Sequence, residues 1–364
     1  MREGSRVQDF DWGMLLIALA ICALGLMQIY SATHNTTYYA GMHWRQFWWV
    51  VLGVIGMLIV SRIDYHTILD QAPLMYIAGM GLLTLVLAVG TVKFGARRWL
   101  TVGGGFDFQV SELIKLVIIV VLARFYSEVR SDRLTLADLA KVGIITGLPL
   151  LLILRQPDLG TALVLVPVAA VGAFLAGIEW KHAVALLLIA VLLLPIGWHF
   201  LKPYQKDRIE SFLNPSQDPR GSGYQVLQSK IAVGSGGFLG KGFAQGSQNQ
   251  GGFLPVRWAD FILAALAEER GFLGVFVTLS LYLALLLRLV LNAQSANDRA
   301  GMYLVMGVAA VLGFHVLVNV AMVIGYMPVT GIPLPLMSYG GSATLFMFMS
   351  LGLVMNVRMR RFVN

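Results

Sequence analysis

The sequence has little charge and almost no cysteine. Only 13% of its 364 residues are charged and 57% are hydrophobic, whereas soluble domains carry roughly a quarter charged residues. These proportions exclude an ordinary soluble globular chain. Cys22 is the only cysteine and lies within an apolar run, which excludes a disulfide framework and a thiolate metal site.

Long apolar runs take the place of the missing charge. A helix needs roughly 20 apolar residues to cross about 30 Å of hydrocarbon, and an outer-membrane barrel would instead show short alternating strands. The sequence therefore predicts an all-α polytopic membrane protein with about ten transmembrane helices. The predicted spans are 12–30, 46–60, 74–90, 113–126, 142–154, 160–176, 183–200, 272–291, 302–325 and 343–357.

The positions of lysine and arginine predict the orientation. Arg62 and Arg299 lie on the same side as the basic residues of both chain ends, and such loops are typically cytoplasmic. Both termini are therefore expected in the cytoplasm. A single membrane domain is predicted over 1–364. Residues 201–271, between spans 7 and 8, are expected to form a long extracytoplasmic loop, with a re-entrant or interfacial helix near 260–270.

The basic residues indicate neither nucleic-acid binding nor a cleaved leader. The formal net charge is +8, but the basic residues lie between apolar runs and form no aromatic-interleaved patch. The first run follows Arg2 and Arg6, exceeds a signal-peptide core in length and lacks a clear small-residue cleavage site. It is expected to remain as the first span.

An ionisable residue at membrane depth is costly, which makes it a candidate functional residue. Asp260 follows the segment 254–259 and precedes the apolar run 261–267. An aspartate in this place is suited to cap a helix, because its oxygen accepts orphan backbone N–H groups. The alternative is a carboxylate with a chemical role. The two interpretations are compatible, since a capped carboxylate can still accept a proton.

Two other charged groups are expected on the outer side. Glu112 and Lys115 lie three residues apart, so on a helix they share a face and can pair. A neutralising pair at a helix start and a functional pair both fit this spacing. In the segment 155–160, proline and glycine indicate a tight extracytoplasmic turn, across which Arg155 and Asp158 can pair.

Residues 333–342 combine two prolines with two glycines at the entry to the last span. Irregular backbone at membrane depth needs protein or a cavity to satisfy its polar groups. The segment is therefore either a broken helix that lines a site, with Ser338 as a candidate binding residue, or a plain outer loop.

Basic residues gather on the same outer side as these carboxylates. Cations of this kind bind phosphate, and phosphate beside lipid indicates a phospholipid or a lipid-linked pyrophosphate. The basic residues are Arg97, Arg98, Lys202, Lys206 and Arg208. No metal-ligand cluster is apparent in the sequence, and a divalent cation, Mg²⁺ or Mn²⁺, is a candidate cofactor only.

Several short motifs follow one another along nearly the full length of the chain. They are 95–100 (GARRWL), 111–115 (SELIK), 156–162 (QPDLGTA), 212–215 (FLNP), 228–232 (QSKIA), 234–237 (GSGG), 260–262 (DFI), 268–269 (EE) and 338–342 (SYGGS). In this order they resemble the SEDS (RodA/FtsW/SpoVE) family of bacterial peptidoglycan polymerases, and most of all its elongation branch. The chain departs from the family at Trp258, Ala259 and Ala343, where histidine, threonine and serine are usual.

The resemblance implies a ten-helix glycosyltransferase that polymerises lipid II into glycan strands outside the bacterial cytoplasmic (inner) membrane. The essential aspartate of the family falls on Asp260. Its glutamate, its lysine and its basic residue near the donor fall on Glu112, Lys115 and Arg208. The other candidate substrate-binding residues are Arg97, Arg98, Asp158, Lys202 and Ser338. A class B penicillin-binding protein and other elongation-complex proteins are the implied partners.

The mechanism we expect uses Asp260 as a general base that takes the proton of the acceptor sugar hydroxyl. Undecaprenyl pyrophosphate then leaves the donor in an inverting displacement, without a covalent glycosyl-enzyme. Two other classes fit the same sequence. One is a lipid II flippase, since broken helices and intramembrane charges are typical of transporters. The other is a non-catalytic scaffold of the elongation complex.

Overall fold

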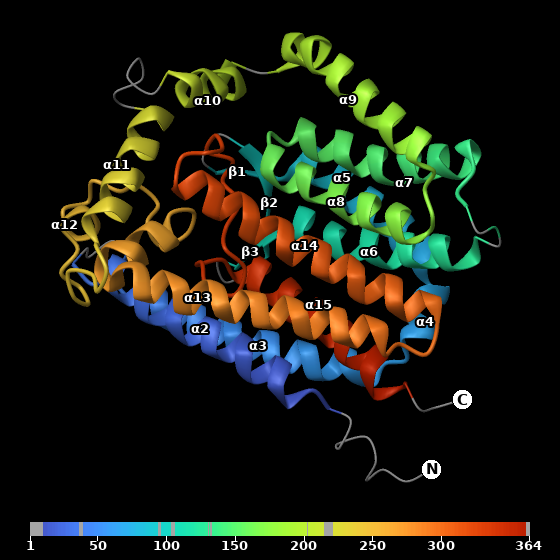
Figure 1. Ribbon diagram of the computed structural model, residues 1–364, viewed down its shortest axis with the longest axis horizontal. Coiled ribbons are helices and arrows are strands. Elements are labelled where there is room, and N and C mark those ends of the chain that lie inside the picture. The colour runs from blue at the N-terminus through green and yellow to red at the C-terminus, as the bar shows by residue number, and fades with distance from the viewer. Residues whose placement is uncertain are drawn as a thin grey trace.

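Long helices form most of the computed structural model (Figure 1). The structure describes residues 10–35, 39–93, 96–102, 106–129, 131, 133–201, 203–214 and 221–361. The helices are α2 Trp12–Thr33, α3 Met42–Arg62, α4 Tyr65–Asp70, α5 Ala72–Val89, α6 Val110–Glu128, α7 Leu136–Arg155, α8 Leu159–Leu175, α9 Trp180–Phe200, α10 Pro203–Leu213, α11 Ser222–Ser235, α12 Ser247–Gln250, α13 Ile262–Gln294, α14 Arg299–Val323 and α15 Gly341–Met359.

Each of the ten predicted spans falls on one of these helices, with ends that differ by a few residues. Within the described ranges, eight helices are long and apolar enough to cross a membrane, and α8 is a shorter apolar helix. The remaining predicted span, α6, has 19 residues and includes Glu112 and Lys115. The prediction of an all-α polytopic membrane fold is confirmed. The exact number of spans and their orientation stay predictions.

A small antiparallel sheet between α5 and α6 was not expected. Its strands are β1 Thr91–Lys93, β2 Ala96–Val102 and β3 Phe106–Gln109, in the order β1-β2-β3. The register places Trp99 opposite Gln109 and Leu100 opposite Phe108. The sheet therefore brings the arginines of β2 beside the start of α6, where the predicted charged pair lies.

Close helix packing depends on small residues, as is typical when lipid gives helices little hydrophobic drive to associate. A Cβ at Gly172 of α8 would overlap the ring of Tyr126 in α6. A Cβ at Gly307 of α14 would come within 2.9 Å of Ile119 in α6. Helix α14 thus lies against α6 and also packs on α8 and α13, which makes it a central element of the bundle.

Helices α9 and α10 lie apart from the main helix bundle. In Figure 1 they arc along one edge of the molecule from the α7–α8 side to α11. The side chains of α9 are largely exposed, with Leu187 at 64% and Leu192 at 71%. Arg208 of α10 lies close enough to Asp260 for its charge to lower the pKa of that carboxyl.

Helix α13 consists of two helical segments that meet at Gly271. The backbone there has φ 63° and ψ −162°, a conformation that favours glycine. The amides of Phe272 and Leu273, freed by the kink, donate to the carbonyls of Gly237 and Phe238. The first segment covers the range in which a re-entrant or interfacial helix was predicted; its depth in the membrane stays a prediction.

The two glutamates just before the kink fix the loop that follows α11. Glu268 is fully buried and accepts hydrogen bonds from Lys241 Nζ, Ser247 Oγ and the backbone amides of Gln248 and Asn249. Glu269 accepts from Gln28 and Ser31 of α2 and from Asn249. Buried carboxylates are tolerated when every oxygen is bonded in this way, so this pair has a structural role.

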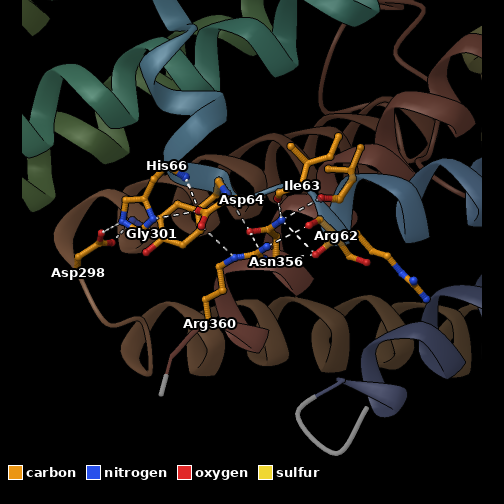
Figure 2. A network of polar contacts seen from close by, with 11 residues as sticks. Arg62, Ile63, Asp64, His66, Asp298, Gly301, Asn356 and Arg360 are labelled. Carbon is orange, nitrogen blue, oxygen red and sulfur yellow. Dashed lines mark hydrogen bonds and ion pairs between the residues drawn. The ribbon is translucent and has the colours of Figure 1, made fainter. Parts of the chain in front are cut away.

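A second polar network lies at the opposite end of the bundle, near α4 (Figures 1 and 2). Asn356 of α15 is fully buried and donates to the carbonyls of Val60 and Ser61 at 2.9 and 3.1 Å. Its Oδ1 accepts from the amide of Tyr65 at 3.0 Å and from Arg360 at 2.9 Å. One side chain thus satisfies both the end of α3 and the start of α4.

Replacing Asn356 should destabilise the fold strongly. Asn356→Ala removes the acceptor of the Tyr65 amide and a donor to the carbonyls of Val60 and Ser61, and we expect a loss of about 3 kcal/mol in unfolding free energy. Thermal unfolding in detergent measures the effect. Asn297→Ala, at a neighbouring exposed asparagine, is the control and should leave Tm unchanged. Equal Tm values for the two variants would contradict the role of Asn356.

His66 joins the same network to α14. Its ring nitrogens lie 3.1 Å from Asp64 and 2.8 Å from Asp298, and Asp298 also caps α14 through the amide of Gly301. Partial burial alone would lower the pKa of His66, but hydrogen bonds and charges from Asp298 and Asp64 outweigh it and raise the pKa.

The contacts of His66 with Asp64 and Asp298 should stabilise the protein more at acidic pH. A raised histidine pKa gives stability that is fully present below the unfolded pKa and lost as pH rises through the folded pKa. The side chain is 57% exposed, so the contribution is at most about 1 kcal/mol. The Tm difference between wild type and His66→Gln should therefore be larger at about pH 5.5 than at about pH 8.5. Asn297→Ala, which removes no titratable group, should show no such dependence.

Candidate active site

Asp260 lies at the end of a turn that precedes α13. The N-cap position of α13 is occupied by Phe261, whose side chain makes no capping bond. The interpretation of Asp260 as a helix cap is therefore wrong. The side chain is half-buried, so the carboxylate is held inside the protein for a reason other than capping.

The backbone around Asp260 is fixed by three donors from elsewhere in the chain. The consecutive carbonyls of residues 258–260 accept hydrogen bonds from the Tyr339 amide at 2.9 Å, Ser338 Oγ at 2.7 Å and Asn319 Nδ2 at 2.9 Å. At position 259 the partner of Ser338 is a backbone oxygen. The replacement of the usual threonine by alanine at this position therefore leaves the contact in place.

The segment that supplies two of these donors, 326–340, is irregular, and residues 334–338 within it are buried. Leu334, Leu336 and Met337 are each no more than 3% exposed. Leu336 has φ 67°, an uncommon conformation for a residue with a branched side chain. Tyr282 of α13 donates to the Pro335 carbonyl at 2.5 Å. These features favour a broken helix enclosed by protein over a plain outer loop; the depth of the segment in the membrane stays a prediction.

Asp158 is the centre of a second cluster. It caps α8, with Oδ1 accepting from the amide of Thr161 at 3.3 Å and Oδ2 from the Thr161 hydroxyl at 3.0 Å. Gln109 and Ser111 donate to the same Oδ2 at 2.8 and 3.3 Å. The ion pair of Asp158 is with Arg98, at 3.4 Å. The expected pairing with Arg155 is wrong, because Arg155 is exposed while β2 brings Arg98 onto the cap.

The charge of Arg98 affects two carboxylates, those of Asp158 and Asp260. Burial raises the pKa of Asp260 to about 6, and the positive charges of Arg208 and Arg98 pull it in the opposite direction. Gly331 lies near the carboxylate, since a Cβ added there would be 3.7 Å from Asp260 Oδ2. A carboxylate with a pKa near 6 beside cations can accept a proton close to neutral pH.

The pair predicted at the start of α6 is present. Glu112 Oε2 and Lys115 Nζ lie 2.7 Å apart, and both side chains are about 7% exposed. His315 of α14 lies on the other side of the lysine, with Nε2 3.4 Å from Nζ. The ammonium is thus held between a carboxylate and an imidazole. Ser111, directly before Glu112, connects this pair to Asp158.

Two of the predicted site residues are placed elsewhere or are not described. Arg97 alternates with Arg98 along β2, and its guanidinium donates to the carbonyl of Ala88 at the end of α5, at 3.3 Å. Arg97 therefore binds carbonyl groups at the C-terminal end of α5. Lys202 lies outside the described residues. Asp260, Arg98, Arg208, Asp158 and Ser338 come together around the turn before α13, and Glu112 and Lys115 adjoin Asp158.

Four residues of this region were not singled out by the sequence: Gln109, Thr161, His315 and Asn319. His315 and Asn319 carried a usable signal, because each is a polar residue within the apolar run of α14, where such residues are costly. Gln109 and Thr161 carried no such signal. They donate to Asp158 only because strand β3 and the cap of α8 bring distant segments together.

A metal site is not apparent in this region. Among the residues that the structure describes, no three His, Cys, Asp or Glu side chains gather in a way that could hold a metal ion.

Comparisons with known proteins agree with one another. The family model described as cell cycle protein (FtsW/RodA/SpoVE) matches residues 11–362. Peptidoglycan glycosyltransferase MrdB of Escherichia coli (strain K12) is 39% identical over 354 residues, which cover 96% of this chain and 94% of that protein. Peptidoglycan glycosyltransferase RodA of Treponema pallidum (strain Nichols) is 33% identical, with 98% and 99% covered.

The fold has a close match among solved structures. A chain from work on the structural coordination of polymerization and crosslinking by a peptidoglycan synthase complex superimposes with a TM-score of 0.84 and 36% identity. The match covers 98% of this chain and 99% of that one. Sequence and structure thus agree over nearly the full length. The chain belongs to the FtsW/RodA/SpoVE family of multi-pass membrane proteins.

Proposed function

We propose that this chain is a peptidoglycan glycosyltransferase that polymerises lipid II on the outer face of the bacterial cytoplasmic (inner) membrane. The observation that carries the proposal is the environment of Asp260, a half-buried carboxylate whose pKa is raised to about 6 beside Arg98 and Arg208. The names of the relatives support the same reaction class.

Asp260 is the general base of the reaction. Its carboxylate takes the proton of an acceptor sugar hydroxyl while the oxygen forms a bond to the anomeric carbon of the donor. The bond from that carbon to the pyrophosphate breaks, and undecaprenyl pyrophosphate leaves with the electron pair. One displacement inverts the anomeric carbon, and no covalent glycosyl-enzyme is needed.

Cations near Asp260 suit the departing pyrophosphate. Negative charge grows on the leaving group, and positive groups held in place stabilise such charge without reorganisation. Arg98 is positioned by Asp158, and Arg208 reaches the same region from α10. Lys115 is held between Glu112 and His315 and supplies a further buried positive charge. In this proposal Glu112, Lys115, Arg208, Asp158 and Ser338 shape the substrate site.

A partner follows from the reaction. Glycan strands must be crosslinked after they form, and the structurally similar chain comes from a complex in which polymerization and crosslinking are coordinated. We therefore expect a class B penicillin-binding protein to bind this chain, within the assembly that elongates the cell.

Removing the base should abolish polymerisation. Asp260→Asn keeps the shape of the side chain but cannot take the proton, so the rate should fall by about 10²–10⁴-fold. The measurement is formation of glycan strands from lipid II by the purified protein together with its class B partner.

Asp138→Asn is the matched control, because this carboxylate belongs to the exposed capping box of α7, and its rate should stay near wild type. Strands formed by Asp260→Asn at near wild-type rate would overturn the base assignment. Movement of labelled lipid II across liposomes without polymer would indicate a flippase. Tolerance of Asp260→Ala in growing cells would indicate a scaffold.

The pH profile should report Asp260 directly. Only the ionised carboxylate accepts a proton, so kcat/KM should fall tenfold per unit of pH below about 6, the raised pKa of this group. Arg98→Gln removes a charge that lowers this pKa, so the acid limb should move to higher pH. Arg97→Gln is the control, since that guanidinium contacts the end of α5 instead. An acid limb that stays in place in Arg98→Gln would contradict the electrostatic role of Arg98.

A further inference from the structure

Asn319 is a fully buried amide near the C-terminal end of the apolar helix α14. Its Nδ2 donates to two carbonyls, those of Asp260 and Ile332, each at 2.9 Å. Its Oδ1 is buried and has no hydrogen-bond partner among the described residues. A buried oxygen of this kind costs about 1–3 kcal/mol, whereas leucine of similar size would fit an apolar helix without that cost.

The two carbonyls belong to two segments that meet near the carboxylate of Asp260. One is the carbonyl of Asp260 itself. The other belongs to Ile332, the residue after Gly331, where an added Cβ would lie 3.7 Å from Asp260 Oδ2. A single amide therefore sets the position of the residue that bears the carboxylate relative to the segment that the carboxylate faces.

The same face of α14 reaches the other charged group of the site. His315 lies four residues before Asn319, so the two side chains project from one face of the helix. His315 Nε2 lies 3.4 Å from Lys115 Nζ. Helix α14 packs along α6 and α8 and so fixes the separation between Lys115 and Asp260.

We infer that Asn319 is a positioning residue for the reaction: its amide holds the backbone of Asp260 so that the carboxylate faces the acceptor hydroxyl. Asn319 is buried and does not touch the substrate. The inference rests on the proposed function, in which Asp260 is the base. A base displaced by about 1 Å costs about 10²-fold in rate, so loss of Asn319 lowers turnover while lipid II still binds.

The test is Asn319→Leu, which removes both donors and keeps the volume. We expect kcat for lipid II polymerisation, measured with the class B partner present, to fall by about 10²-fold. KM for lipid II should change by less than about threefold, because Asn319 makes no contact that binds lipid II in the ground state.

Asn292→Leu is the matched control. Asn292 is also a fully buried asparagine, and its Nδ2 donates to Asp11 at the opposite end of the bundle. A similar loss in Tm is expected for both variants, but kcat should stay near wild type in Asn292→Leu. Equal loss of kcat in the two variants would show that Asn319 contributes to folding only, and would overturn the inference.

A second variant covers the case in which Asn319→Leu does not fold. Asn319→Asp keeps the shape and replaces the donor by an oxygen that repels the two carbonyls. Its kcat, taken at its own pH optimum, should fall as far as that of Asn319→Leu. Near wild-type kcat would overturn the inference. Asp260→Asn in the same assay separates the two claims, because strands formed by Asp260→Asn would instead overturn the proposed base.

Discussion

The pairing of two irregular segments, 255–261 and 326–340, is the interaction on which the candidate site depends. Backbone N–H and C=O groups within a membrane protein must find partners inside the protein, because hydrocarbon offers none. Here the carbonyls of residues 258–260 take donors from Tyr339, Ser338 and Asn319. The same bonds that make irregular backbone tolerable also hold Asp260 in a defined place.

Helix α14 transmits that constraint to the rest of the site. It carries Asn319 toward Asp260 and His315 toward Lys115, while its packing on α6 and α8 sets the distance between them. Arg98 completes the arrangement from the opposite side, because β2 brings it against Asp158 at the start of α8. Charges that would be costly alone are thus paired or bonded, and the half-buried carboxylate of Asp260 keeps a raised pKa.

Features set by local sequence could be predicted, and features set by contacts between distant segments could not. Apolar run length located the helices on which the ten predicted spans fall, and the spacing of Glu112 and Lys115 predicted their pair. The cap assigned to Asp260 was wrong because α13 begins one residue later than the turn signals suggested. Asp158 was paired with Arg155, its neighbour in sequence, since nothing local shows that β2 brings Arg98 across. Polar residues inside α14 were visible but had no partner until the fold supplied one.

In the proposed reaction the fold holds Asp260 where it can take the proton of the acceptor. The most direct measurement is a structure of the protein with its class B partner and a lipid II analogue that cannot react. We expect an acceptor hydroxyl within about 3 Å of the Asp260 carboxylate, with the pyrophosphate of the donor beside Arg98 and Arg208. A pyrophosphate bound on the far side of the molecule, or an acceptor whose hydroxyls contact other residues and leave Asp260 apart, would contradict this expectation.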